Sequence, residues 1–88
     1  MILTQSDIDD TSKIFGTIFS DAVLVHSRIV PGGVRVRVVY EDDERNQTLV
    51  IDEEHIRAVD TPEEYRVLVT DAAKDHRFRV KLARVLGP

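Results

Sequence analysis

The most regular pattern of apolar and polar positions lies at residues 34–38, where valines alternate with arginines. This two-residue period is typical of a strand with one face in water. A segment rich in β-branched residues precedes it at 22–30, and the Pro-Gly-Gly sequence at 31–33 between the two segments is a turn signal. A polar turn at 41–46 then leads to a third apolar segment at 47–51. The pattern predicts a three-stranded antiparallel meander.

Apolar residues on either side of the meander recur with the three- to four-residue spacing of helices. In the N-terminal part this spacing predicts a helix over residues 6–19, with Ser6 or Asp7 as its cap. In the C-terminal part Thr61 begins a capping box with a proline at the first helical position, and Gly87 follows a basic last turn. We therefore expect one long helix, or two short helices, after Thr61.

The C-terminal part also permits a second interpretation. Residues 65–69 and 78–82 alternate in polarity, so they would form a second hairpin in a mostly β fold. Residues 52–59 are ambiguous between a helical turn and a short fourth strand. The helical interpretation is preferred and predicts the α+β class for a single domain over residues 1–88. The residues expected in its core are Phe15, Ile18, Phe19, Val36, Val38, Leu49, Ile51, Tyr65, Leu68 and Leu86.

The composition excludes several functional classes. The 88 residues include no cysteine, which excludes disulfide scaffolds, thiol nucleophiles and cysteine-based zinc or iron–sulfur sites. No apolar run approaches the roughly 20 residues that span a bilayer. The N-terminus lacks the pattern of a signal peptide. We therefore expect a cytoplasmic protein that does not act at a membrane.

Catalytic and metal-binding patterns are weak in this chain. The histidines His26, His55 and His76 lie far apart and match no spacing of a metal site or a catalytic triad. His26 sits within an apolar strand, which indicates a partly buried structural role. The carboxylates at 52–54 are interpreted as a solvated acidic turn, and no glycine-rich loop precedes a helix to hold phosphate. We expect no enzymatic activity, no cofactor and no metal site.

Charge is unevenly distributed along the chain, whose net charge is −4. Residues 1–40 are neutral overall, residues 41–64 include ten acidic and two basic residues, and residues 65–88 include two acidic and six basic residues. Segregated charge steers association and selects partners. We therefore expect a small protein-binding module, such as an adaptor, an inhibitor or an assembly subunit.

Acidic residues form the first candidate partner surface. Its members are Glu41, Asp42, Asp43, Glu44, Asp52, Glu53 and Glu54. The strand of residues 47–51 separates the first four from the last three by about 17 Å, at roughly 3.4 Å per residue. One partner can use both groups only through an elongated basic site, such as a nucleic-acid channel, in the way that small phage-encoded inhibitors do. Self-association as a homodimer is a second form of the same interpretation.

Basic residues form the alternative surface. Its members are Arg77, Arg79, Lys81 and Arg84. A helix with such residues can track phosphates, so nucleic-acid binding is the alternative function. The order helix, three-stranded meander, helix is also that of double-stranded-RNA-binding domains. Their basic motif at the start of the last helix is absent, because residues 62–64 are Pro-Glu-Glu, and nucleic acid is therefore the less favoured partner.

Overall fold

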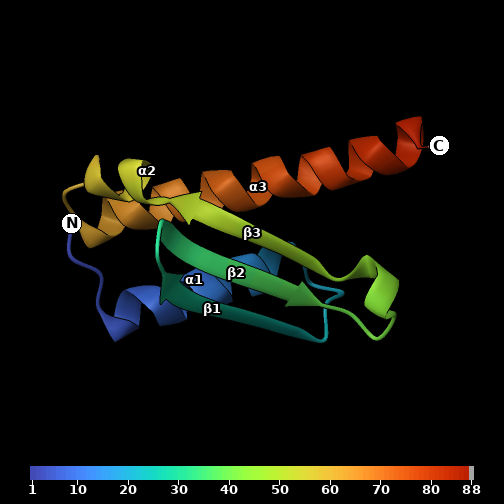
Figure 1. Ribbon diagram of the computed structural model, residues 1–88, viewed down its shortest axis with the longest axis horizontal. Coiled ribbons are helices and arrows are strands. Elements are labelled where there is room, and N and C mark those ends of the chain that lie inside the picture. Colours follow the sequence, from blue (N-terminus) through green and yellow to red (C-terminus); the bar gives the residue numbers. More distant parts are fainter. Residues whose placement is uncertain (88) are drawn as a thin grey trace.

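A three-stranded antiparallel sheet and the two helices on one of its faces make up the computed structural model, which describes residues 1–87 (Figure 1). The elements in chain order are α1 (Gln5–Ile18), β1 (Leu24–Val30), β2 (Gly33–Val39), the 3₁₀ turn η1 (Asp43–Arg45), β3 (Gln47–Asp52), α2 (Glu53–Arg57) and α3 (Pro62–Leu86). The predicted α+β order of helix, meander and helix is confirmed. The ambiguous segment 52–59 contains the helical turn α2, and the C-terminal part is one long helix, so the second hairpin does not form.

The cap of α1 differs from the prediction. Thr4, not Ser6 or Asp7, is the N-cap: its hydroxyl accepts a hydrogen bond from the Asp7 backbone N–H at 3.3 Å. The Asp7 carboxylate in turn accepts a hydrogen bond from the Thr4 backbone N–H at 2.8 Å. This is a capping box with aspartate in the place where the usual pattern has glutamate or glutamine, so the pattern does not reveal it in the sequence.

The hairpin between β1 and β2 depends on two glycines. Val30 pairs with Gly33 across the turn, and the intervening Gly32 has a φ of 94°, in the left-handed region that glycine adopts most readily. Gly33 has a φ of 146°, and a Cβ atom there would lie 1.9 Å from the carbonyl oxygen of Ile51. The close approach of β2 to the end of β3 therefore requires a residue without a side chain.

The core lies between the sheet and the helices. The strand order is β1-β2-β3, and the predicted alternation is confirmed because Val34, Val36 and Val38 of β2 are fully buried. Helix α1 packs against β1, β2 and α3, while α2 joins the end of the sheet to α3. The core residues are Ile8, Phe15, Phe19, Val34, Val36, Val38, Tyr40, Ile51, Ile56, Tyr65, Val69 and Ala73. Ile18, Leu49 and Leu68 are partly buried against this core.

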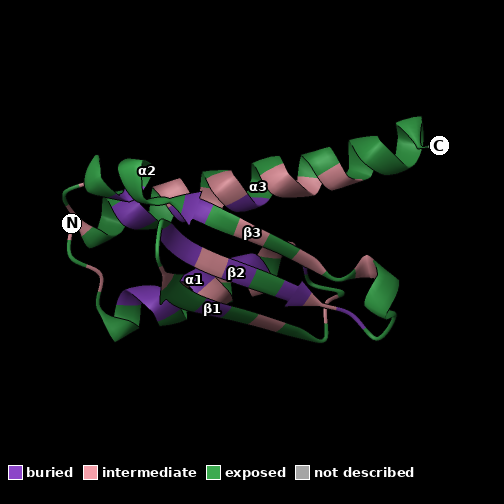
Figure 2. Ribbon diagram, in the orientation of Figure 1, coloured by how far each residue is buried: buried purple, intermediate pink, exposed green. Residues whose placement is uncertain are grey.

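The predicted burial of Leu86 is wrong, because its side chain is 72% exposed. A helix of 25 residues is about 37 Å long at 1.5 Å per residue, whereas a strand of seven residues spans only about 24 Å. The C-terminal turns of α3 therefore extend past the strands, as Figures 1 and 2 show. Every described residue from Lys81 onward is exposed.

The predicted partial burial of His26 is also wrong. Neighbouring residues of a strand point to opposite faces of the sheet, and Ser27 takes the buried face of β1. His26 is exposed on the other face, over which no helix packs in Figure 1.

Candidate binding surface on helix α3

The C-terminal half of α3 exposes a line of large apolar side chains. Phe78, Leu82 and Val85 are 63%, 43% and 82% exposed. Their spacing of four and three residues places them on one side of the helix. The buried residues of α3, among them Val69 and Ala73, lie on the opposite side of the helix. The three exposed residues, here called the α3 stripe, therefore face away from the core.

Charged side chains flank the α3 stripe on both sides. At about 100° per residue, Lys74 and Lys81 fall on one side of Phe78, and Asp75 and Arg79 fall on the other. Arg79 Nε lies 3.1 Å from Asp75 Oδ2, so this second flank holds a surface ion pair. The first flank carries two positive charges, and no ion pair in residues 1–87 involves either lysine. The stripe thus has one flank that is purely cationic.

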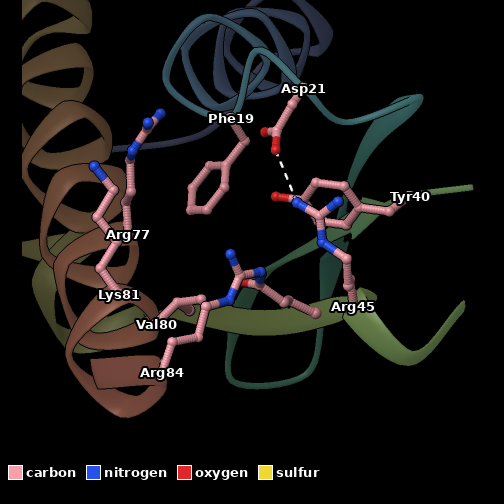
Figure 3. Close-up of a pocket in the computed structure, with 9 residues that line it drawn as sticks. Phe19, Asp21, Tyr40, Arg45, Arg77, Val80, Lys81 and Arg84 are labelled. Carbon is pink, nitrogen blue, oxygen red and sulfur yellow. Dashed lines mark hydrogen bonds and ion pairs between the residues drawn. The ribbon is translucent and has the colours of Figure 1, made fainter. Parts of the chain in front are cut away.

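The cationic flank continues into a groove between α3 and the end of the sheet (Figure 3). Arg77, Lys81 and Arg84 line the groove from α3, and Arg45 lines it from η1. Arg77 donates a hydrogen bond to the backbone carbonyl of Ile18 at the end of α1. The groove encloses about 50 Å³, far less than the several hundred Å³ of a typical small-molecule site. It can hold the end of a charged side chain.

Arg45 is held in place within this groove. Its guanidinium donates a hydrogen bond to Asp21 Oδ2 at 2.8 Å and lies 4.3 Å from the centre of the Tyr40 ring. The hydrogen bond from Arg45 lowers the pKa of the Asp21 carboxyl below its usual value. The Tyr40 backbone N–H donates to Asn46 Oδ1 at 2.8 Å, which fixes the connection between β2 and β3. Among residues 1–87, Asp21 is the only carboxylate that lines the groove, beside four basic side chains, so the groove is cationic.

The four basic residues of the sequence-based candidate surface do not all meet. Arg77, Lys81 and Arg84 lie along one side of α3 and line the groove together, whereas Arg79 lies on the other side with Asp75. Arg45, which the sequence pattern did not single out, joins the first three because η1 packs beside α3 (Figure 3).

The acidic candidate surface is divided between the two ends of the sheet (Figure 1). Residues 41–44 lie in and before η1, and residues 52–54 lie at the start of α2. Residues 47–51 of β3 lie between them and span about 17 Å. Some of these carboxylates have local roles: Asp42 caps η1 and Glu53 pairs with Arg57 at 2.8 Å. The two acidic groups thus form separate surfaces.

The three histidines lie on three different elements, β1, α2 and α3. Nε2 of His76 lies 2.7 Å from Oε1 of Gln47 and links α3 to β3. Burial, with a smaller contribution from the positive charge of Arg79, lowers the pKa of His76. His55 and His26 are exposed and lie on α2 and β1. Within residues 1–87, no group of three histidines or carboxylates has the arrangement of a metal site.

The α3 stripe was not predicted from the sequence, and the reason is physical. From the helical spacing over the whole length of α3, we expected one face of the helix to pack against the core throughout. The spacing of Phe78, Leu82 and Val85, on the side opposite Val69 and Ala73, was the available signal. Its meaning depends on which side of α3 the sheet and α1 cover, which is a property of the folded chain.

Comparisons with known proteins identify no relative of this chain. It matches no protein-family model, no curated protein and no solved structure. Among the helices of residues 1–87, none combines the length and the apolar character needed to cross a membrane.

Proposed function

We propose that this protein is a non-enzymatic protein-binding module that docks an acidic amphipathic helix of a partner on the α3 stripe. The observation that carries the proposal is the exposure of Phe78, Leu82 and Val85 in one line, on the side of α3 opposite its buried residues. Single exposed apolar residues are common on protein surfaces, but a contiguous apolar patch is typical of an interaction site. Anchors at positions i, i+4 and i+7 match the contact spacing of packed helices.

The charges beside the stripe favour a partner with carboxylates. Lys74 and Lys81 border one side of the stripe, and the groove beyond them adds Arg77 and Arg84. Glutamates at the edges of a partner helix would pair with these groups, as charged residues do beside the seam of a coiled coil. The partner therefore combines an apolar helical face with acidic residues along its border.

A second copy of this chain is a less suitable occupant. In an antiparallel pair centred on Phe78, each Lys74 would lie beside Lys81 of the other copy, because the two lysines share one flank at nearly equal distances from the centre. A parallel pair would instead place the lysine flank of each copy beside the flank of the other copy that holds the Asp75–Arg79 ion pair, so only the antiparallel pair brings the lysines together. Like charges at such positions oppose association. Charge complementarity thus supports an acidic partner.

Two synthetic helical peptides test the proposal. Both have leucine at the seam positions of three heptads, and the flanking positions carry glutamate in one peptide and lysine in the other. The glutamate peptide is expected to bind, to shift the amide NMR signals of residues 74–86, and to bind more weakly as salt is added. Failure of this peptide to bind, or equal binding of the lysine peptide, would contradict the proposal.

Matched variants locate the contact. Phe78→Ser/Leu82→Ser is expected to weaken binding of the glutamate peptide by about a hundredfold, since two apolar anchors are lost. Val67→Ser is the control, because Val67 is also an exposed apolar residue of α3 but lies about three helical turns before Phe78, outside the stripe. Circular dichroism checks that both variants retain the helix. Equal effects of the two changes would contradict the assignment of the site.

Two further measurements test the alternatives, which are self-association and nucleic-acid binding. Light scattering is expected to give a monomer, and a dimer that Phe78→Ser/Leu82→Ser abolishes would replace the acidic partner with a second copy. Random-sequence DNA and RNA are expected to bind more weakly than the glutamate peptide. Tighter binding of nucleic acid, lost in Arg77→Gln/Arg84→Gln, would establish the nucleic-acid alternative instead.

A further inference from the structure

The face of the sheet turned away from the helices carries a cluster of basic side chains. Arg28 of β1 lies directly opposite Arg35 of β2, and His26 lies directly opposite Arg37. Directly opposed residues in an antiparallel pair point to the same face of the sheet. The buried valines of β2 occupy the alternating positions and point to the helices. The four basic side chains therefore share the open face.

Within the described part of the chain, these arginines form no ion pair. The ion pairs found in residues 1–87 involve other arginines, and none includes Arg28, Arg35 or Arg37. On β3 the residue opposite Arg37 is Thr48, and the residue opposite Arg35 is Val50. A carboxylate at either position would lie opposite one of these arginines and could pair with it. Instead Arg35, Arg37 and Thr48 line a shallow hollow of about 240 Å³.

The arrangement opposes the stability of the sheet. Like charges directly opposite each other on neighbouring strands are destabilising, and the pair Arg28 and Arg35 is such a case. Features that violate a local rule with no compensation in the fold are expected at functional sites. Arginine is also the side chain best suited to bind carboxylates through two parallel hydrogen bonds.

We infer that the open face of the sheet is a second binding surface, which receives a short acidic segment of a partner protein. The guanidinium groups of Arg28, Arg35 and Arg37 bind its carboxylates. Leu24 and Val50 are about half exposed on the same face and supply apolar contact beside the charges. This inference is independent of the α3 stripe, because the helices pack against the opposite face of the sheet.

The surroundings of the cluster favour a protein over a nucleic acid. The acidic residues 41–44 lie beyond one end of the strands, and Asp52, the last residue of β3, begins the acidic group 52–54 at the other end, so the cationic surface extends for about 17 Å along the strands. A nucleic acid that followed the strands would bring phosphates against these carboxylates. The strand positions on this face include no Phe, Tyr or Trp on which a base could stack. A compact group of two or three carboxylates fits between the acidic groups and needs no aromatic side chain for stacking.

Hexaglutamate tests this inference, with single-stranded and duplex DNA of similar charge as comparison ligands. The peptide is expected to bind the protein and to shift the side-chain Nε signals of Arg28, Arg35 and Arg37 in NMR spectra. Arg35→Gln/Arg37→Gln is expected to weaken binding by about tenfold or more. Lys13→Gln/Arg57→Gln removes the same charge from α1 and α2 and is expected to leave the affinity unchanged. An equal loss in both variants would overturn the inference, because hexaglutamate would then respond only to overall charge.

Two more outcomes bear on the inference. Phe78→Ser/Leu82→Ser is expected to bind hexaglutamate like the parent protein, so this surface can fail or succeed independently of the α3 stripe. DNA that binds more tightly than hexaglutamate through the same arginines would overturn the choice of partner. The melting temperature of Arg35→Gln/Arg37→Gln is expected to equal or exceed that of the parent, because a repulsion is removed. A lower melting temperature would assign the arginines to the fold and contradict a binding role.

Discussion

The hydroxyl oxygen of Tyr65 lies 2.7 Å from Oγ1 of Thr11, and both side chains are fully buried. The Thr11 hydroxyl donates its hydrogen to the Asp7 carbonyl at 2.8 Å, so the Tyr65 hydroxyl is the donor in the bond between them. This chain of hydrogen bonds joins α3 to α1 across the core. Burial raises the pKa of Tyr65, so the phenol stays protonated and keeps its donor role.

The Tyr65–Thr11 bond is expected to stabilise the fold measurably. Tyr65→Phe is expected to lower the free energy of unfolding by about 1–2 kcal/mol, because it removes the donor. Thr11→Val leaves the buried Tyr65 hydroxyl without an acceptor and is expected to cost about as much or more. Urea denaturation of both variants and of the double variant gives the coupling. If the two losses simply add, the bond contributes nothing of its own.

Two glycines are expected to respond in opposite directions to substitution by alanine. Gly33→Ala is expected to destabilise the protein by more than about 2 kcal/mol, because the new Cβ would strike the Ile51 carbonyl and the φ is positive. Gly16→Ala is the matched control: it lies within α1 with no atom within 4 Å of the added Cβ. It is expected to stabilise by about 0.5–1 kcal/mol. Thermal melting of the two variants decides the matter, and a stabilised Gly33→Ala would contradict the described turn.

Substitutions at Phe15 and at Leu86 compare the buried core with the exposed C-terminal end of α3. Phe15 is fully buried and stacks on Phe19, with ring centres 6.1 Å apart. Phe15→Ala is expected to cost about 3–5 kcal/mol, a large part of the stability of a domain of this size. Leu86→Ala is expected to change stability by less than about 0.5 kcal/mol. Similar unfolding midpoints for the two variants would contradict the boundary between core and exposed end.

His76 is expected to make stability depend on pH. Its pKa in the folded protein is lowered from 6.5, mainly by burial, so the unfolded chain binds the proton more readily. The free energy of unfolding should therefore fall as the pH falls through 6.5, and this contribution should level off below the pKa of the folded state. His76→Gln keeps a hydrogen-bonding group toward Gln47 and does not titrate. Urea denaturation between about pH 5 and 8 should show the stability difference between parent and variant changing with pH. A constant difference would contradict the shift.

The elements that sequence patterns predicted well are those whose cause is local. Alternation at residues 34–38 reports directly on the two faces of β2, and the turn at 31–33 depends on its own glycines. The capping threonine of α3 also acts locally, since Thr61 accepts a hydrogen bond from the Glu64 backbone at 3.1 Å. Such features depend on neighbouring residues in the chain, so the local sequence pattern is sufficient to predict them.

The features that sequence patterns missed depend on distant segments. The exposure of Leu86 follows from the length of the sheet, and the exposure of His26 follows from the absence of a helix on one face of the sheet. Arg45 joins the groove because η1 comes to lie beside the end of α3. The pairing of Arg28 with Arg35 depends on the register of the hairpin. Candidate binding surfaces of this kind emerge only when the elements are placed in space.

Helix α3 is packed in the core near its N-terminal end and exposed at its C-terminal end. The hydrogen bonds of its two ends should therefore open at different rates. Near Tyr65 and Val69, whose side chains are buried, we expect the backbone amides to exchange with solvent deuterium slowly, through opening of the core. Beyond Lys81 the helix can fray without disturbing any buried side chain, so its amides should exchange within a small fraction of that time. A ligand on the α3 stripe should slow exchange in these last turns alone. Residue-by-residue protection would then distinguish occupation of the stripe from a general gain in stability.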